Sequence, residues 1–331
     1  MSTVAGTSRR AMDAVANVLP RSVSVTGRDP STALIGDLPV RVTWIGEGRL
    51  RNARSALEGS SGQPEILVAR RMSPGAREAI IDAGLSWVDE MGAAHIVIDS
   101  IVVIREGRSI PRPGEWSPSV VAVAEALLCG TTATVEATQE ATGLSAGSCT
   151  NALRLLEDTD LLESDADRGR NSARRVASLE RLLDAYTSEV LRAPATPRLQ
   201  LGVTWRDPVV GLRDIGERWA ELPIAWACTG TVAASVIAPH LTSGATAEAY
   251  VGTETIAGLE AVARRTELKP IEGGKLTIRP FPTDATRRLA ETKTGLRIAP
   301  WPRVYADLQT VGVRGEEAAE HLWEVVRAGR A

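Results

Sequence analysis

The side chains best suited to chemistry in this sequence lie at the start of one helical stretch, which begins after Ser145. Apolar residues recur there at the spacing of a single helix face: Cys149, Ala152, Leu153 and Leu156. The opposite face then carries small or hydrogen-bonding residues and one cation: Ser145, Gly147, Ser148, Thr150, Asn151 and Arg154. Amide and guanidinium groups near a helix start can hydrogen-bond to base edges in a major groove. The pattern therefore predicts a surface that reads nucleic-acid bases.

A second group of basic side chains follows in "DLLESDADRGRNSARRV", residues 160–176, which predicts a strand, a turn and a returning strand. Four arginines lie close together with no acidic residue among them: Arg168, Arg170, Arg174 and Arg175. A basic hairpin of this kind contacts phosphates or the minor groove. Acidic residues are frequent at 157–167, so the DNA-facing surface must be separated from them.

The elements that must position these groups form a helix-turn-helix pattern. Apolar residues recur at helical spacing over 117–130, and Thr134 can cap a second short helix. Gly143 then supplies a tight turn, and Ser145 can cap the third helix. With the basic hairpin and a connecting helix over 178–191, this predicts a winged helix-turn-helix at 114–192. A plain three-helix bundle with an exposed basic hairpin remains the alternative.

The flanking segments predict two α/β domains. Residues 38–113 mix strands with a helix for which Ser73 is the cap and Pro74 the first residue. Residues 199–331 again alternate strands and helices. Residues 1–37 contain a short helical pattern and then a stretch interrupted by proline and glycine, so we predict an N-terminal arm there. The predicted fold class is α+β.

Composition excludes several classes of protein. The net charge is −3, so contact with nucleic acid has to come from a local patch and not from an overall basic excess. The three cysteines and three histidines do not have metal-ligand spacing, and we predict no metal and no cofactor. No apolar run is long enough to span a bilayer, and no secretory signal is visible. We therefore expect a cytoplasmic protein.

The chain resembles AbiEi-like antitoxins and regulators of type IV, abortive-infection toxin–antitoxin systems. The resemblance covers about 117–331 and is carried by "VEATQEATGLSAGSCTNALRLLEDTDLL" in the winged-helix region and by three C-terminal segments: "CTGTVAASVIAPHLT", "GGKLTIRPF" and "WPRVYADLQTVGVRGEEAAEHL". It implies a DNA-binding winged helix joined to a degenerate nucleotidyltransferase-like domain, and repression of the protein's own operon. More weakly, 38–113 is similar to the restriction-endonuclease-like scaffold of PD-(D/E)XK nucleases.

Both resemblances can be checked against the residues that catalysis needs. A nucleotidyltransferase needs paired carboxylates on a strand after a Gly-Ser or Gly-Gly turn to hold Mg²⁺. Here Gly230-Thr231 could supply the turn, but the strand offers Glu248 alone. A nuclease needs an acidic residue two before a lysine, where this chain has Val68-Ala69-Arg70, with Glu65 just upstream. We therefore predict no catalytic residues.

Other charged residues of the 38–113 segment have less specific interpretations. Asp89 and Glu90 are more typical of a turn beside a strand than of a site. Arg70, Arg71 and Arg77 could form a second basic face, and a solvated helix edge is the alternative.

The sequence thus predicts a transcriptional repressor that binds double-stranded operator DNA and regulates a toxin–antitoxin or phage-defence operon. A toxin encoded by that operon is a candidate partner, and the oligomeric state is left open, a homodimer included. The rival from another class is a metal-dependent nuclease or nucleotidyltransferase that the winged helix targets. A third reading is a protein-interaction module.

Overall fold

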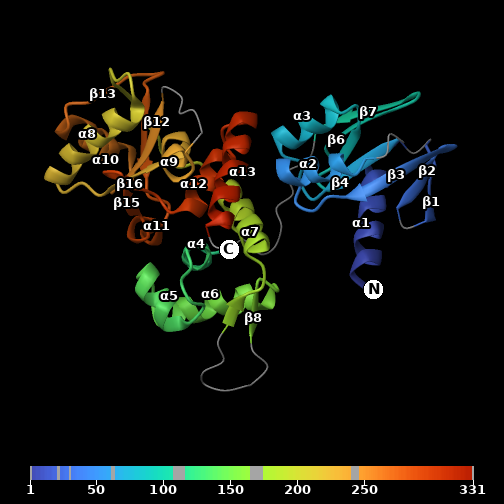
Figure 1. Cartoon of the computed structure of the whole chain (residues 1–331), viewed down its shortest axis with the longest axis horizontal. Coiled ribbons are helices and arrows are strands. Elements are labelled where there is room, and N and C mark those ends of the chain that lie inside the picture. The colour runs from blue at the N-terminus through green and yellow to red at the C-terminus, as the bar shows by residue number, and fades with distance from the viewer. Residues whose placement is uncertain are drawn as a thin grey trace. The chain divides into compact units, whose positions relative to one another are not determined.

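The computed structural model describes residues 2–20, 23–29, 31–60, 64–106, 116–164, 174–239 and 246–329. The chain forms two compact units (Figure 1): residues 1–113 with 312–320, and residues 114–311 with 321–331. Each unit combines helices with a seven-stranded sheet that has parallel and antiparallel neighbours, which confirms the α+β class. Within the described part of the chain, no helix has the length and apolar character needed to cross a membrane.

The sheet of the first unit has its strands in sequence order. Its three central strands, β3 to β5, are parallel and are joined through α2 and α3, and the outer strands are antiparallel to their neighbours. The strands are β1 Val25–Asp29, β2 Thr32–Ile35, β3 Leu38–Trp44, β4 Glu65–Ala69, β5 Ser86–Asp89, β6 Ala94–Ile98 and β7 Ile101–Arg105.

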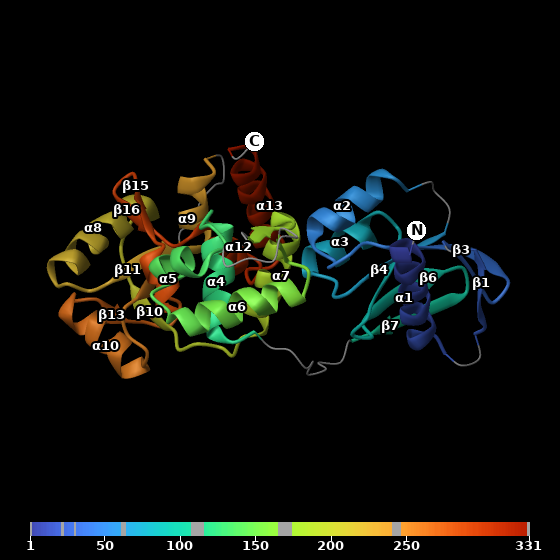
Figure 2. The same cartoon turned by 90° about the horizontal axis from the view of Figure 1, so that it is seen from below.

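Helices cover both faces of this sheet (Figure 2). One apolar cluster joins α1 (Ser2–Val18) to one face, and a second joins α2 (Leu50–Glu58) and α3 (Pro74–Asp82) to the other. Adjacent strand residues alternate between the clusters: Leu67 packs under α2 and α3, and Val68 packs under α1. Residues 1–37, predicted as an arm, supply α1, β1 and β2, so they belong to the core of the first unit.

The start of α3 is held by a buried carboxylate from distant sequence. As predicted, Ser73 caps this helix and Pro74 opens it. Glu316, which is fully buried, accepts hydrogen bonds from Ser73 Oγ at 2.6 Å and from the Gly75 N–H at 3.0 Å. A helix N-terminus has unpaired N–H groups and a positive dipole end, so a carboxylate is favourable there. Residues 312–320 therefore belong to the first unit and not to the predicted 199–331 domain.

The turn after β3 depends on glycine. Gly46 and Gly48 both have φ +79°, a left-handed conformation that side chains other than glycine disfavour. The two positions differ in their surroundings. A Cβ at Gly48 would lie 2.5 Å from the Arg71 carbonyl oxygen, whereas a Cβ at Gly46 would meet open space. Gly48 thus lets the β3–α2 turn approach the end of β4.

The second unit begins with a helical segment built around α4. This helix is buried over most of its length and packs against α5, α6, α7 and α11. A short antiparallel pair of strands follows α6, with Leu162 opposite Val176. The elements are α4 Pro118–Leu128, α5 Val135–Thr142, α6 Ala146–Asp158, β8 Leu162–Ser164, β9 Arg174–Val176 and α7 Leu179–Arg192.

The remaining strands of this unit form the second sheet, in the order β13-β10-β14-β12-β11-β16-β15. They are β10 Leu199–Gly202, β11 Trp226–Thr229, β12 Ala247–Val251, β13 Lys269–Pro270, β14 Leu276–Pro280, β15 Glu291–Lys293 and β16 Leu296–Ile298.

Helices flank the second sheet on both sides. In Figures 1 and 2, α8 and α10 lie on one side of it and α9 and α12 on the other. The helices are α8 Pro208–Glu221, α9 Gly230–Ile237, α10 Ile256–Arg265, α11 Asp284–Arg288, α12 Trp301–Leu308 and α13 Val313–Ala328. Because α4 packs on α11 and α7 packs on α12, the predicted 114–192 segment shares one compact unit with the second sheet.

The Gly46 and Gly48 pair gives a matched test of the turn. We expect Gly46→Ala to lower the free energy of unfolding by about 1 kcal/mol, from backbone strain alone. Gly48→Ala carries the same strain plus a clash with backbone, and we expect it to cost at least about 2 kcal/mol more. Calorimetric unfolding of both variants measures the difference. Equal losses would show that the contact with Arg71 does not constrain the turn.

Candidate nucleic-acid interface and a buried polar network

The approach to α6 is set by two local devices. Gly143 ends α5 in the left-handed conformation at φ +74°, which allows the chain to turn sharply. Ser145 then caps α6, because its side chain accepts a hydrogen bond from the Ser148 N–H at 3.2 Å. Both predicted caps, Thr134 and Ser145, are confirmed.

The two faces of α6 differ as predicted. Its apolar face is buried against α4 and α5: Cys149, Ala152, Leu153 and Leu156. On the other face, Ser145, Gly147, Asn151 and Arg154 are exposed, and Ser148 and Thr150 are half-buried. The Thr150 hydroxyl donates to the Ala146 carbonyl, and the Ser145 and Ser148 hydroxyls contact each other.

Asn151 and Arg154 differ from their neighbours on α6. Among the described residues, neither side chain has a hydrogen-bond or ion-pair partner. Their polar groups are therefore available for contact with another molecule.

The predicted wing arginines have different surroundings. Arg174 is half-buried and its Nε donates to Glu157 of α6 at 2.8 Å, so it ties β9 to α6 and is not a free phosphate contact. Arg175 is exposed and forms an ion pair with Glu163 at 2.7 Å on the strand opposite. An exposed pair of this kind is weak, so Arg175 can exchange Glu163 for another anion. Arg168 and Arg170 lie outside the described residues.

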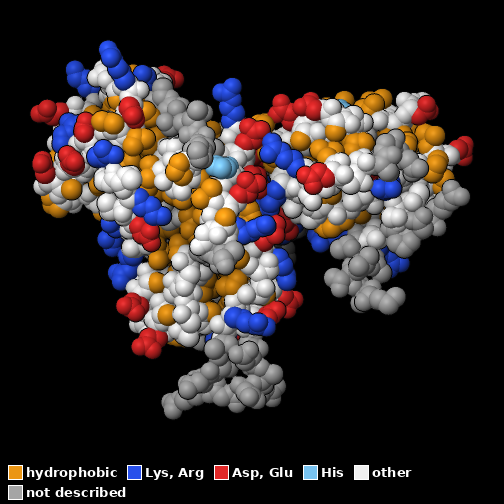
Figure 3. Space-filling model, in the orientation of Figure 1, with side chains coloured by type: hydrophobic (Ala, Val, Ile, Leu, Met, Phe, Trp, Pro, Cys, Tyr) orange, Lys and Arg blue, Asp and Glu red, His pale blue; other side chains and the backbone are white. Residues whose placement is uncertain are grey.

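Charge on the visible surface is mixed. On the face shown in Figure 3, Lys and Arg side chains alternate with Asp and Glu side chains over both units. This agrees with a net charge of −3, and no single-sign patch dominates the described part of this face.

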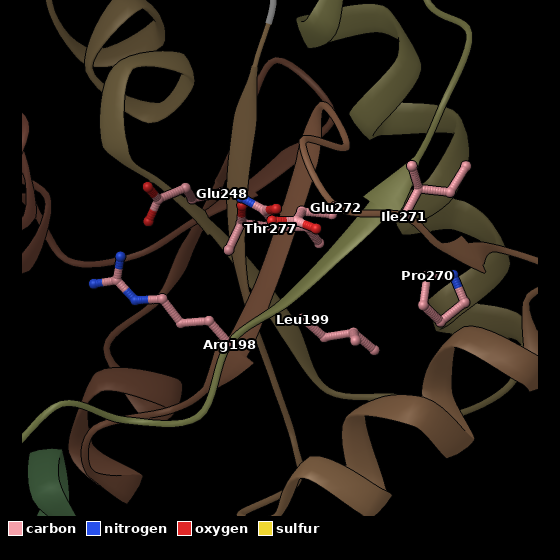
Figure 4. A pocket seen from close by; sticks show the side chains of 8 residues that line it. Arg198, Leu199, Glu248, Pro270, Ile271, Glu272 and Thr277 are labelled. Carbon is pink, nitrogen blue, oxygen red and sulfur yellow. The ribbon is translucent and has the colours of Figure 1, made fainter.

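A row of polar residues crosses one face of the second sheet. Gln200, Thr277, Glu248 and Thr229 are neighbours across β10, β14, β12 and β11. Beside this row lies a depression of about 540 Å³ (Figure 4), with Arg198 and Glu248 at one side and Pro270 and Ile271 at the other. Gly230, with φ +65°, follows β11 where Gly230-Thr231 was considered as a phosphate-binding turn.

Deeper in the same face lies a buried cluster centred on Asp307 of α12. Its carboxylate accepts hydrogen bonds from Thr229 Oγ1 and from Tyr250 Oη, both at 2.5 Å. It also forms ion pairs with Arg279 at 2.8 Å and with Arg303 at 3.0 Å. Asp307 is only 3% exposed. Burial alone would raise the pKa of Asp307, but the guanidinium groups of Arg303 and Arg279 and the two hydroxyl donors outweigh it and lower that pKa.

Arg279 links Asp307 to Glu248. Its Nη2 lies 2.8 Å from Asp307 and 3.2 Å from Glu248, and its guanidinium stacks on the Tyr250 ring at 4.6 Å. Glu248 is the one carboxylate predicted for this site, and Asp307 was missed because it is distant in sequence. The signal it overlooked is the i, i+4 spacing of Arg303 and Asp307 on an otherwise apolar helix. In the structure, a side-chain cation lies between the two carboxylates.

A second buried carboxylate, Glu125, connects α4 with the rest of the unit. It is fully buried and accepts hydrogen bonds from Tyr186 Oη at 2.6 Å and Thr286 Oγ1 at 3.2 Å, while its other oxygen has no hydrogen-bond partner among the described residues. Burial raises the pKa of Glu125, and the Tyr186 hydrogen bond and the charge of Arg303 offset only part of that effect.

Two buried acidic residues of the first unit, Glu65 and Asp89, have structural partners. Glu65 accepts hydrogen bonds from the hydroxyls of Thr43 and Ser60. Buried Asp89 accepts from the N–H groups of Met72 and Ala93, and burial raises the pKa of Asp89. Within the described ranges, no group of three or more His, Cys, Asp or Glu residues could hold a metal ion.

The predicted second basic face is mostly paired. Arg70 lies 3.4 Å from Glu47, and Arg77 lies 3.5 Å from Asp89 and over the Trp87 ring. Arg71 is exposed. The arginines therefore belong largely to the network that fixes the carboxyl ends of β3, β4 and β5.

Asp307→Asn tests the buried network. We expect it to lower the free energy of unfolding by about 3–5 kcal/mol at neutral pH, because two buried guanidinium groups lose their anionic partner. The folded-state pKa of Asp307 lies below its ordinary value of 3.8. The contribution of Asp307 to the free energy of unfolding is therefore present above pH 3.8 and is lost as the pH falls through the folded-state pKa. Denaturant unfolding at several pH values should therefore show the difference from wild type shrinking in acid.

Glu125→Gln is the matched contrast, because it also neutralises a buried carboxylate in the same unit. The folded-state pKa of Glu125 is raised. Its contribution to the free energy of unfolding is therefore fully present below the ordinary pKa of 4.5 and is lost as the pH rises through the folded-state pKa. Glutamine keeps an acceptor for Tyr186. We expect this variant to be at least as stable as wild type at about pH 8. A loss as large as that of Asp307→Asn would contradict this account of the two carboxylates.

Comparison with protein-family models, with curated proteins and with solved structures gave no match.

Proposed function

We propose that this chain is a sequence-specific double-stranded DNA-binding transcriptional regulator and that α4 to β9 form its winged helix-turn-helix. The order of elements supports this: three helices, a glycine turn between α5 and α6, and a two-stranded antiparallel pair after α6. In the proposal, α6 enters the major groove and the hairpin contacts the DNA backbone or minor groove.

One observation carries the proposal. On α6, the exposed Asn151 and Arg154 have no partner among the described residues, whereas Arg174 and Arg175 are paired with acids. A polar amide and a guanidinium that stand one helical turn apart match the groups that read adenine and guanine. Gly147 at the helix start leaves room for close approach to the DNA.

The resemblance to AbiEi-like regulators extends the proposal to biology. We infer that the protein represses its own operon, which encodes a toxin or another phage-defence component, and that it acts in the cytoplasm. The first unit would then be a non-catalytic restriction-endonuclease-like scaffold, supported by the parallel β3-α2-β4-α3-β5 arrangement. The second sheet would be a degenerate nucleotidyltransferase-like domain.

The position of Arg279 favours a regulator over the rival metal-dependent enzyme. Its guanidinium already pairs with both Glu248 and Asp307, so neither carboxylate is left uncompensated to hold a cation. We expect no nucleotidyl transfer or cleavage when the protein is incubated with Mg²⁺ or Mn²⁺, labelled nucleotides, tRNA and plasmid DNA. Product that disappears in Glu248→Ala but persists in Arg154→Ala would establish the enzyme instead.

DNA binding is tested by separating specific from non-specific affinity. The protein is first used to select its operator from random genomic fragments. We expect Asn151→Ala and Arg154→Ala each to cost about 1–3 kcal/mol on that operator and little on random DNA, because base contacts specify sequence. We expect Arg175→Ala to weaken both affinities by a similar factor and to lower the salt slope by about one.

Arg264→Ala is the matched control. It removes one positive charge from an exposed helix outside the predicted interface, and it should change neither affinity. For each variant, titrations with operator DNA and with random DNA at two salt concentrations give four dissociation constants. If Asn151→Ala and Arg154→Ala bind the operator as tightly as Arg264→Ala does, α6 is not the recognition helix.

A further inference from the structure

The last strand of the first sheet carries unusually exposed apolar side chains. Ile104 and Val102 of β7 are 71% and 62% exposed, the highest values among the large apolar residues that the structure describes. Val97 lies opposite Val102 on the neighbouring strand β6 and is 50% exposed. Through the register of β5, β6 and β7, these side chains share the sheet face on which α2 and α3 cover the central strands. The apolar surface therefore continues beyond the helices to the edge of the sheet.

The backbone of β7 is open on its outer side. It is the last strand of the sheet and, among the residues that the structure describes, it pairs with β6 alone, to which a two-residue turn at Asp99 and Ser100 joins it. In a hairpin with a two-residue turn, the residues on either side of the turn, here Ile98 and Ile101, form a hydrogen-bonded pair. From Ile101 onwards, the peptide groups of successive β7 residues point alternately towards β6 and away from it. Val103 thus bonds to β6, whereas the N–H and C=O groups of Val102 and Ile104 point away from the sheet. The exposed side chains and the open peptide groups belong to the same two residues.

The other outer strands of the two large sheets are protected against strand addition. β13 consists of Lys269 and Pro270, and β15 carries Glu291 and Lys293. The ladder between β1 and β2 is interrupted between Gly27 and Asp29. Charges, proline and bulges are the devices by which proteins block pairing at an edge.

β7 has none of these devices along Val102 to Ile104. Its one charged residue, Arg105, belongs to the face that carries α1 and donates to the carbonyl groups of Asn17 and Val18 at the end of that helix. The edge at β7 can therefore pair with a further strand, whereas the edges at β1, β13 and β15 are blocked.

We propose that β7 pairs antiparallel with β7 of a second copy of this chain, about a two-fold axis that passes through Val103. In this register Val102 lies opposite Ile104 of the second copy, and Ile104 lies opposite Val102. The four outward peptide groups of each strand then form four hydrogen bonds between the copies, and both sheets join into one. If the register shifts by two residues, either Val102 or Ile104 pairs with the same residue of the second copy, and the other one loses its apolar partner. If the register shifts by one residue, the apolar side chains of the two copies lie on opposite faces of the joined sheet.

The occupant is a second copy because the strand is complementary to itself. Each branched apolar side chain meets another one across the axis, and Val97 of each copy extends the two rows. The pairing uses one five-residue strand, so we expect a dimer that dissociates on dilution and not an obligate one. This inference rests on the first unit alone and does not depend on the proposed function.

The double substitution Val102→Lys/Ile104→Lys tests the proposal in the full-length protein. Both side chains are exposed, so the change should leave the fold intact, which circular dichroism and thermal unfolding verify. Like charges would face each other across the axis and block pairing. Val210→Lys/Ile256→Lys is the matched control, because it replaces two apolar side chains of 47% and 46% exposure in the second unit and adds the same charge.

Sedimentation velocity over a dilution series up to about 100 µM gives the oligomeric state. We expect wild type and control to shift towards twice the 35.2 kDa chain mass as concentration rises, and the β7 variant to remain a monomer. Hydrogen exchange should show protection of the Val102 and Ile104 amides that grows with concentration in wild type and in the control but not in the β7 variant. A wild-type chain that stays monomeric, or a dimer that survives the β7 substitutions, would overturn the proposal.

Discussion

Asp307 places a charged carboxylate in the interior of the second unit, where an ion without compensation would cost several kcal/mol. The compensation comes from four groups on four different elements: Thr229 at the end of β11, Tyr250 on β12, Arg279 on β14 and Arg303 on α12 itself. Each group reaches the carboxylate only if its strand keeps its register and α12 stays on this face of the sheet. A displacement of any one element would leave a buried charge or hydroxyl without its partner. The arrangement therefore specifies one packing of α12 against the sheet more strictly than apolar contacts would.

The same cluster reaches into the helical segment. The positive charge of Arg303 acts on Glu125 in the middle of α4, and Glu125 is hydrogen-bonded by Tyr186 of α7 and Thr286 of α11. α11 follows β14 directly, and its Arg288 packs over Gly143 and donates to the Glu140 carbonyl. The turn before α6 is thus held by an element whose position the second sheet determines. This explains why the helical segment and the sheet form one compact unit instead of two separable domains.

The sequence predicted those features that depend on neighbouring residues. The caps Ser73, Thr134 and Ser145 and the turn at Gly143 follow from local backbone chemistry, and the buried face of α6 follows from helical periodicity. The features that were missed depend on distant pairs. Arg279 and Asp307 are polar residues in apolar segments, and nothing near either one in sequence identifies its partner. Strands β1 and β2 were missed because they are short and lie in a stretch rich in glycine and polar residues, and they join the sheet only by pairing with each other and, through β2, with β3.

The pairing of arginines also governs how an acidic chain can bind a polyanion. A surface of unpaired cations attracts any DNA, because each released counterion adds affinity regardless of sequence. In this protein many arginines are already neutralised by carboxylates, among them Arg70, Arg174 and Arg279, so they add little to non-specific attraction. Arg154 keeps an exposed charge beside Asn151 on α6, where geometry favours base edges over phosphates. In the proposed complex with operator DNA, this pairing would move the balance of affinity from counterion release towards direct contact with bases. A regulator must bind one operator in preference to the many competing sites of a genome. Affinity that comes from base contacts serves this purpose better than affinity for any DNA.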